Sequence, residues 1–188
     1  MWDVNRALKV GANVYHVYIA CVLAKLRELG MLKFGIIKEA AEATGRSVAQ
    51  YVAAQGLSFG SVEEALEVLN AAFGFSDEIR LRAREDGVIE VMFHKNTCKI
   101  CPRNVGGLEL PGPACPNVGF VKGYLEGLGL VKLKEKFDVL NGEPPVKQQD
   151  GYCVISYQVL ERGAGLEKAP IQILTPSAKA APVKPTLS

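Results

Sequence analysis

Apolar residues in the first part of the chain recur every three or four positions, which is the spacing of one face of an α-helix. Such stretches run from Trp2 to Leu29, from about Phe34 to Ala54, and from Ser61 to Ala72. The third begins with Ser61-Val-Glu-Glu, in which a serine N-cap precedes a glutamate by three residues. The pattern therefore predicts one long N-terminal helix followed by two more helices.

After these helices, hydrophobic residues recur at every second position, which is the spacing of a β-strand. Residues Glu78–Arg84 and Val88–His94 each alternate polar and apolar side chains, and Asp86-Gly87 between them is typical of a hairpin turn. We expect two antiparallel strands joined by this turn.

The elements after the hairpin complete the predicted fold. A helix is expected at about residues 116–129, and further strands at about Leu130–Val139 and Gly151–Leu160, with a Gly- and Pro-rich loop at 141–150. The order αααββαββ predicts an α+β fold, in which an N-terminal helical layer packs on a four-stranded antiparallel sheet.

The composition is that of a folded domain with a tail. A chain of 188 residues with 48% hydrophobic and 7% aromatic residues can bury a full core. We expect residues 1–162 to form a single ligand-binding domain. Residues 163–188, rich in proline, alanine and lysine, are predicted to be an irregular tail that is mobile or docks only through Ile171–Leu174.

The charge pattern argues against nucleic acid and membrane as partners. The formal net charge is +2, from 22 basic and 20 acidic residues, and no block of like charge marks a phosphate-binding surface. The uncharged stretch Gly11–Ala24 is shorter than the ~20 apolar residues that span a bilayer. The five cysteines lack the spacing of a secreted disulfide framework, which favours a cytoplasmic protein.

The densest chemical pattern lies between the hairpin and the next helix. Cys98-Lys-Ile-Cys101 is followed by Cys115, and a Cys-x-x-Cys pair places two thiolates within reach of one metal ion. The set predicts structural zinc, with His94 or Cys153 as the fourth ligand. Two other interpretations stay open: a disulfide between Cys98 and Cys101, and unrelated small buried residues.

The predicted helix after the cysteines carries Gly119, Gly123 and Gly127 on one face. Each glycine costs about 0.5–1 kcal/mol relative to alanine in a helix interior, so three together need a reason. One reason is close packing on the sheet or on another helix, and the other is space for a ligand. The aromatic residues expected to line such a pocket are Phe120 and Tyr124 on this helix and Tyr18 and Tyr51 on earlier helices.

The order of these parts resembles the 4-vinyl-reductase, or hydrocarbon-binding, domain, whose superfamily includes the TRAPP vesicle-tethering subunits and the haem nitric-oxide-binding domains. The similar features are the cysteine loop, the Gly119-x-x-x-Gly123-x-x-x-Gly127 helix and a glycine-containing helix like Glu42-Ala-Thr-Gly45 before the hairpin, within about residues 1–160. The resemblance implies an internal channel for a small apolar molecule and pairing through helices. It implies these site residues: Cys98, Cys101, Cys115, Gly119 and Gly123.

The function expected from these features is binding or sensing of a small hydrophobic or aromatic molecule, with a structural zinc site beside the pocket. Haem is not expected, because neither His16 nor His94 has the helical setting typical of a proximal ligand. A metal- or thiol-dependent enzyme is an alternative, although no Ser-His-Asp set, Walker loop or His-Glu-x-x-His motif occurs. A helical assembly subunit without a ligand is another.

We also expect a homodimer formed through the first helix. Its core-facing residues are predicted to be Val14, Tyr15, Tyr18, Ile19 and Val22. A second apolar flank, made of Val10, Val17 and Ala24, would then stay uncovered, and an uncovered apolar patch marks an interface. The simplest partner is the same helix of a second copy, and the competing occupant is Ile171–Leu174.

Overall fold

The computed structural model describes residues 2–138, 141–163 and 172–174. The helices are α1 (Val4–Lys9), α2 (Val14–Glu28), α3 (Phe34–Ala54), α4 (Val62–Phe73) and α5 (Asn117–Gly127). The strands are β1 (Ile79–Ala83), β2 (Val88–His94), β3 (Val131–Glu135), β4 (Lys147–Gln149), β5 (Tyr152–Arg162) and β6 (Gln172–Leu174).

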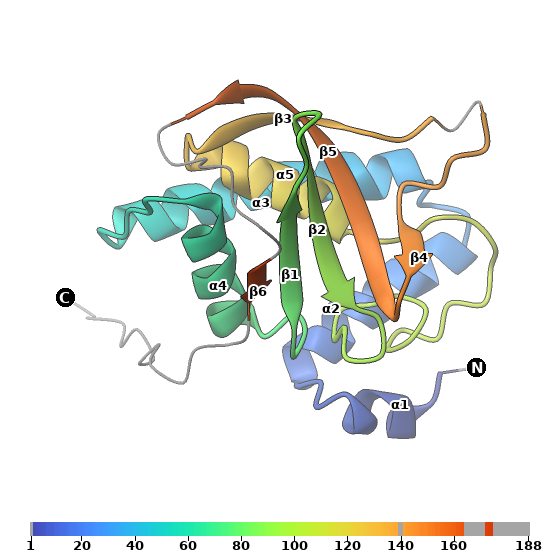
Figure 1. Cartoon of the computed structure of the whole chain (residues 1–188). Coiled ribbons are helices and arrows are strands. Elements are labelled where there is room, and N and C mark those ends of the chain that lie inside the picture. The colour runs from blue at the N-terminus through green and yellow to red at the C-terminus, as the bar shows by residue number, and fades with distance from the viewer. Residues whose placement is uncertain (1, 139–140, 164–171, 175–188) are drawn as a thin grey trace.

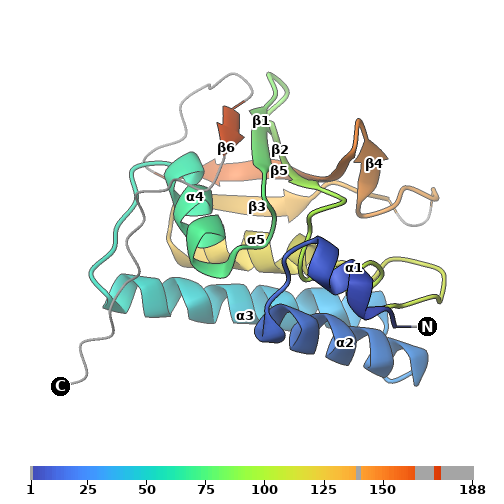
Figure 2. The same cartoon turned by 90° about the horizontal axis from the view of Figure 1, so that it is seen from below.

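The strands form one antiparallel sheet in the order β3-β5-β2-β1-β6, with β4 paired to the beginning of β5 (Figure 1). One face of this sheet is covered by α5, and α3 lies against the far side of α5 (Figure 2). The α+β fold predicted from the sequence is therefore confirmed. Two short strands add to the four that were predicted: β4 lies in the expected loop, and β6 in the expected tail pairs with β1.

Local sequence features begin and end several elements as predicted. Ser61 is the N-cap of α4, where its hydroxyl accepts a hydrogen bond from the Glu64 backbone N–H at 3.1 Å. The Asp86-Gly87 turn joins β1 and β2, and Gly87 has φ +77°, a conformation that favours glycine.

The predicted long first helix is wrong, because the chain breaks it into α1 and α2. Gly11 has φ +65°, which a helix interior does not allow, and the next helix begins with a new N-cap at Asn13. The Asn13 side chain accepts from the His16 N–H at 3.0 Å, and the Asn13 N–H donates to the His16 ring at 3.1 Å. This reciprocal capping pair fixes the start of α2.

The buried face of α2 is the opposite of the predicted one. His16, Ala20 and Ala24 are its buried residues. The five residues expected to face the core are exposed: Val14, Tyr15, Tyr18, Ile19 and Val22. The reason is a close backbone contact with the cysteine loop, where a Cβ on Gly106 would lie 2.3 Å from the Ala20 carbonyl oxygen. Only small side chains allow that approach, so the alanines face inward.

The glycines of α5 bring its backbone against that of α3. A Cβ on Gly119 would lie 2.0 Å from the Lys38 carbonyl oxygen, and one on Gly123 would lie 2.0 Å from that of Glu42. From the other helix, a Cβ on Gly45 would lie 2.3 Å from the Phe120 carbonyl oxygen. These glycines are therefore explained by helix–helix packing rather than by an open groove.

Charged side chains surround this helix contact. Glu42 is buried, and its carboxylate pairs with Arg46 at 2.8 Å and with Lys122 at 3.0 Å. Glu135 at the end of β3 pairs with Lys38 at 2.9 Å. The network links α3, α5 and the sheet with its charges paired, as buried charges require.

Candidate ligand cavity

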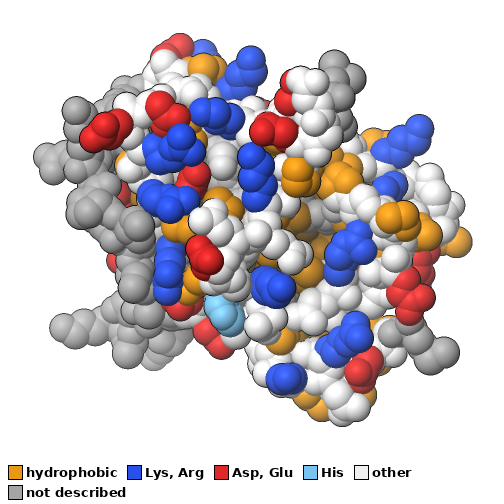
Figure 3. Space-filling model, turned by 45° about the vertical axis from the view of Figure 1, so that its right-hand side comes forward, with side chains coloured by type: hydrophobic (Ala, Val, Ile, Leu, Met, Phe, Trp, Pro, Cys, Tyr) orange, Lys and Arg blue, Asp and Glu red, His pale blue; other side chains and the backbone are white. Residues whose placement is uncertain are grey.

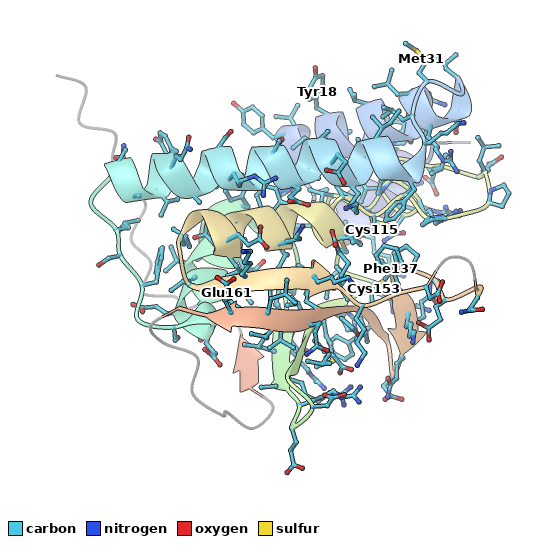
Figure 4. All side chains as sticks on the ribbon, turned by 90° about the horizontal axis from the view of Figure 1, so that it is seen from above. Tyr18, Met31, Cys115, Phe137, Cys153 and Glu161 are labelled. Carbon is cyan, nitrogen blue, oxygen red and sulfur yellow. The ribbon has the colours of Figure 1, made fainter. Side chains whose placement is uncertain are left out.

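A cavity of about 820 Å³ lies beyond the N-terminal end of α5. Its wall comes from the first turns of α3, the loop between β2 and α5, residues 142–146 of the connection from β3 to β4, and the start of β5. Cys115, Phe137 and Cys153 lie together in this region (Figure 4). Most of the lining is apolar, and both the size and the character are those of a small-molecule site.

Four of the five cysteines line this cavity. Cys98 and Cys101 lie in the loop after β2, Cys115 lies just before α5, and Cys153 is the second residue of β5. All five are free thiols, and Cys21 on α2 lies apart from the other four. The fold therefore gathers the three cysteines of the sequence motif and adds Cys153.

Burial and mutual repulsion favour the neutral thiol at Cys98, Cys115 and Cys153. Burial raises the pKa of Cys98 well above its ordinary value, and Cys101, Cys115 and Cys153 raise it further. Burial also raises the pKa of Cys115 to about 12 and that of Cys153 above its usual range. Without a compensating cation, ionising these sulfur atoms in this cavity is costly.

Backbone N–H groups point at three of the sulfur atoms. The Asn104 N–H donates to Cys101 Sγ at 3.4 Å, and the Ile100 N–H donates to Cys98. Cys115 accepts from the first residues of α5, Asn117 and Val118. Such donors stabilise a thiolate more than a thiol, so at Cys98 and Cys115 they lower the pKa against the larger effect of burial.

The chemistry of this donor set fits a soft metal ion, which would supply the missing positive charge. Within the described residues, however, no three His, Cys, Asp or Glu side chains are already arranged to hold one ion. Shared ligation would therefore require thiol side chains to rotate towards one another.

The structure places His94, one of the two predicted fourth ligands, away from the cysteines. Phe93 pairs with Cys153 and His94 pairs with Tyr152, so His94 projects from the sheet face opposite to the cavity. There the His94 ring packs edge-on against Tyr152, with 5.4 Å between ring centroids, and its Nδ1 lies 3.3 Å from the Thr97 hydroxyl. Of the two alternatives, the geometry favours Cys153.

The residues predicted to bind the apolar ligand are not brought together around one cavity. Gly119 and Gly123 contact α3, while Phe120 and Tyr124 are buried in the main core. Tyr18 and Tyr51 are exposed, and Tyr18 points away from the molecule (Figure 4). The cavity lies instead at the end of the glycine helix.

The sequence reasoning missed Asn117, which lines the cavity and is only 1% exposed. Its side-chain Oδ1 is buried, and among the described residues it has no hydrogen-bond partner. Its backbone carbonyl is used, because the Tyr157 hydroxyl lies 3.3 Å from it. Only its position at the start of a helix, directly after Pro116, could have drawn attention to it.

The described residues contain no helix that is both long and apolar enough to cross a membrane. The fold and the cavity thus define a class: an α+β protein with helices on one face of its sheet and a thiol-lined cavity at the end of that helical layer.

The chain belongs to the MJ0207 family. Residues 30–159 match this family, which is more than half of the 188 residues and includes all four cavity cysteines. The chain is also similar to the uncharacterized protein MJ1342 of Methanocaldococcus jannaschii, with 28% identity over 87 residues, or 46% of this chain and 73% of that protein. No solved structure matches it. Neither the family nor this relative provides a link to 4-vinyl reductase or TRAPP subunits.

Proposed function

We propose that this protein binds a small apolar molecule in the cysteine-lined cavity, as a binding or sensing module comparable to the 4-vinyl-reductase-like domains. The observation that carries the proposal is the cavity of about 820 Å³, which is mainly apolar and has Asn117 in its wall, a residue whose buried Oδ1 has no partner among the described residues. Natural ligand sites combine such a wall with a few polar groups. The free thiols suit a reducing cytoplasm.

A neutral dye tests the cavity directly. N-phenyl-1-naphthylamine should become fluorescent on binding the parent protein. Val146→Trp, at a half-buried cavity position, should abolish this signal because the indole fills the space. Leu160→Trp, on an exposed position of the sheet outside the cavity, is the matched control and should leave binding unchanged. Equal binding by both variants would refute a ligand site in this cavity.

The second part of the proposal is one zinc ion held by Cys98, Cys101, Cys115 and Cys153. Its support is the common cavity and the N–H groups directed at sulfur. Elemental analysis of protein purified without chelators should find about one zinc per chain. Cys115→Ser and Cys153→Ser should lose the metal, whereas Cys21→Ser and His94→Ala should keep it. A metal-free parent, or loss of metal in His94→Ala alone, would contradict this ligand set.

The exposed face of α2 supports a second role, assembly into a homodimer. Val14, Tyr15 and Tyr18 are 73%, 75% and 68% exposed, and Ile19 and Val22 extend the same face. Leu29 and Met31 continue it beyond the helix, and Met31 points outward like Tyr18 (Figure 4). Taking ~150–250 Å² for a fully exposed aromatic residue, this face offers on the order of 700 Å². A stable dimer buries about 800 Å² per partner, so a second copy of α2 fits as the occupant.

A further inference from the structure

The cavity combines an apolar wall with an excess of positive charge. Among the described residues, three basic side chains line it, Lys38, Lys95 and Arg103, against one acidic side chain, Glu143. Figure 3 shows the same arrangement on the surface, where Lys and Arg side chains surround a hollow that has hydrophobic side chains within it. This charge balance differs from that of the whole chain, which is nearly neutral with a net charge of +2.

Two of these cations have no carboxylate partner in the described part of the chain. Lys38 is already paired with Glu39 and Glu135, each within 2.9 Å. In the described part of the chain, Lys95 donates to the neutral Gln148 side chain at 3.4 Å, and Arg103 donates to the Gly112 backbone carbonyl.

The single acidic residue of the lining does not neutralise them. Glu143 pairs with Lys147, four residues later in the chain, at 3.4 Å. In the metal-free protein, Lys95 and Arg103 therefore leave a positive potential over the cavity, and a low-dielectric wall strengthens it.

Asn117 supplies a second polar group inside the cavity. Its side-chain Oδ1 has no hydrogen-bond partner among the described residues, and the residue is almost completely buried. A carboxamide can present either its oxygen or its NH₂ group to a ligand by rotation. A buried polar group without a partner is costly, and a polar atom of a ligand would remove that cost.

From this arrangement we infer that the cavity binds an amphipathic anion, an apolar body carrying one carboxylate-like or sulfonate-like group. The apolar part lies against the cavity wall, the anionic group faces Lys95 and Arg103, and Asn117 hydrogen-bonds to a polar atom of the ligand. This inference rests on the proposed function and adds the chemical class of the ligand to it.

A matched pair of dyes tests the charge requirement. 1-Anilinonaphthalene-8-sulfonate and N-phenyl-1-naphthylamine share one apolar body, and only the first carries a sulfonate. The parent should bind the sulfonate more tightly than the neutral dye. Lys95→Gln and Arg103→Gln should each weaken sulfonate binding about two- to fivefold, the range for exposed ion pairs, and leave the neutral dye unaffected. Salt at ~1 M should likewise weaken binding of the sulfonate dye and should not weaken binding of the neutral dye.

Two controls separate the possible failures. Lys134→Gln removes an exposed cation of β3 outside the cavity and should change neither affinity. Val146→Trp should abolish binding of both dyes. Because this substitution changes the cavity and leaves the exposed face of α2 intact, such a loss shows that the dyes do not bind to α2.

The two proposals fail in different ways. The anion inference is wrong, and the proposed function stands, if the neutral dye binds in the cavity but the sulfonate dye binds no more tightly and its affinity is unchanged by Lys95→Gln and Arg103→Gln. If only the sulfonate binds, with the expected charge dependence, the proposed binding of a neutral apolar molecule fails, and the cavity is a site that requires the anionic group. Binding of neither dye overturns both.

Discussion

The contact between α3 and α5 predicts opposite effects for two glycine-to-alanine substitutions. At Gly123 the new Cβ would lie 2.0 Å from the Glu42 carbonyl oxygen, whereas ordinary Cβ contacts begin at 3.4 Å. That oxygen belongs to the backbone of a 21-residue helix and cannot rotate away, so restoring a 3.4 Å contact moves the helices about 1.4 Å apart. At Gly35, in the first turn of α3, no atom lies within 4 Å of the new Cβ.

The magnitudes follow from two opposing terms. Alanine gains up to ~1 kcal/mol over glycine in a helix. Overpacking a rigid contact costs about 3 kcal/mol at the upper end of its usual range. Gly123→Ala should therefore destabilise the protein by about 2 kcal/mol, which lowers the melting temperature by roughly 4–8 °C for a domain of this size. Gly35→Ala should stabilise it by about 0.5 kcal/mol.

Thermal and urea unfolding of the two variants measure these differences. A double variant sharpens the test, because Gly45→Ala forces the same two helices apart from the other side. Once the helices have separated, the second alanine should cost less than it does alone. Fully additive losses, or a Gly123→Ala variant as stable as the parent, would refute the backbone contact as the reason for these glycines.

Two further predictions concern charge and assembly. Burial favours a higher pKa for Glu135, but the hydrogen-bonded ion pair with Lys38 outweighs it, so the folded-state pKa lies below the ordinary value. A lowered folded-state pKa gives stability that is present above the unfolded pKa of about 4.3 and is lost as pH falls through the folded value. Urea unfolding should show that the free energy of unfolding falls less between pH 6 and pH 3 in Glu135→Gln than in the parent. Equal decreases would contradict the ion pair. In sedimentation experiments the parent should be a dimer and the Tyr18→Glu variant should be a monomer. The control variant Leu160→Glu, on the exposed sheet face, should remain a dimer. A monomeric parent would exclude the α2 interface.

The sequence predicted best those features that neighbouring residues determine. The bounds predicted for α3 and β2 match the structure, as do the Ser61 cap and the Asp86-Gly87 turn. Periodicity and capping act within a few residues, so they can be read without knowing the fold.

The misread features depend on contacts between distant segments. The inward face of α2 was misassigned because large apolar residues were expected inside, whereas the backbone contact with Gly106 selects Ala20. The break before α2 did have a local indication in Gly11 and Asn13, which the continuous apolar spacing concealed.

The candidate site was predicted in part for the same reason. Cys98, Cys101 and Cys115 are close in sequence and do share the cavity. The position of Cys153 follows from its pairing with Phe93 across β2 and β5, a register that single-sequence patterns do not contain. That alternation also directs His94 to the opposite face.

The cavity wall is assembled from residues as far apart as Phe34 and Cys153. During synthesis, which proceeds from the N-terminus, the helices and the first hairpin leave the ribosome while the cavity still lacks one side. It can close only after β5 has emerged and paired with β2, which joins Phe93 to Cys153. Until then the cysteines of the loop are exposed thiols on an unfinished chain. The complete cavity is therefore available to a small molecule only late in translation or after release.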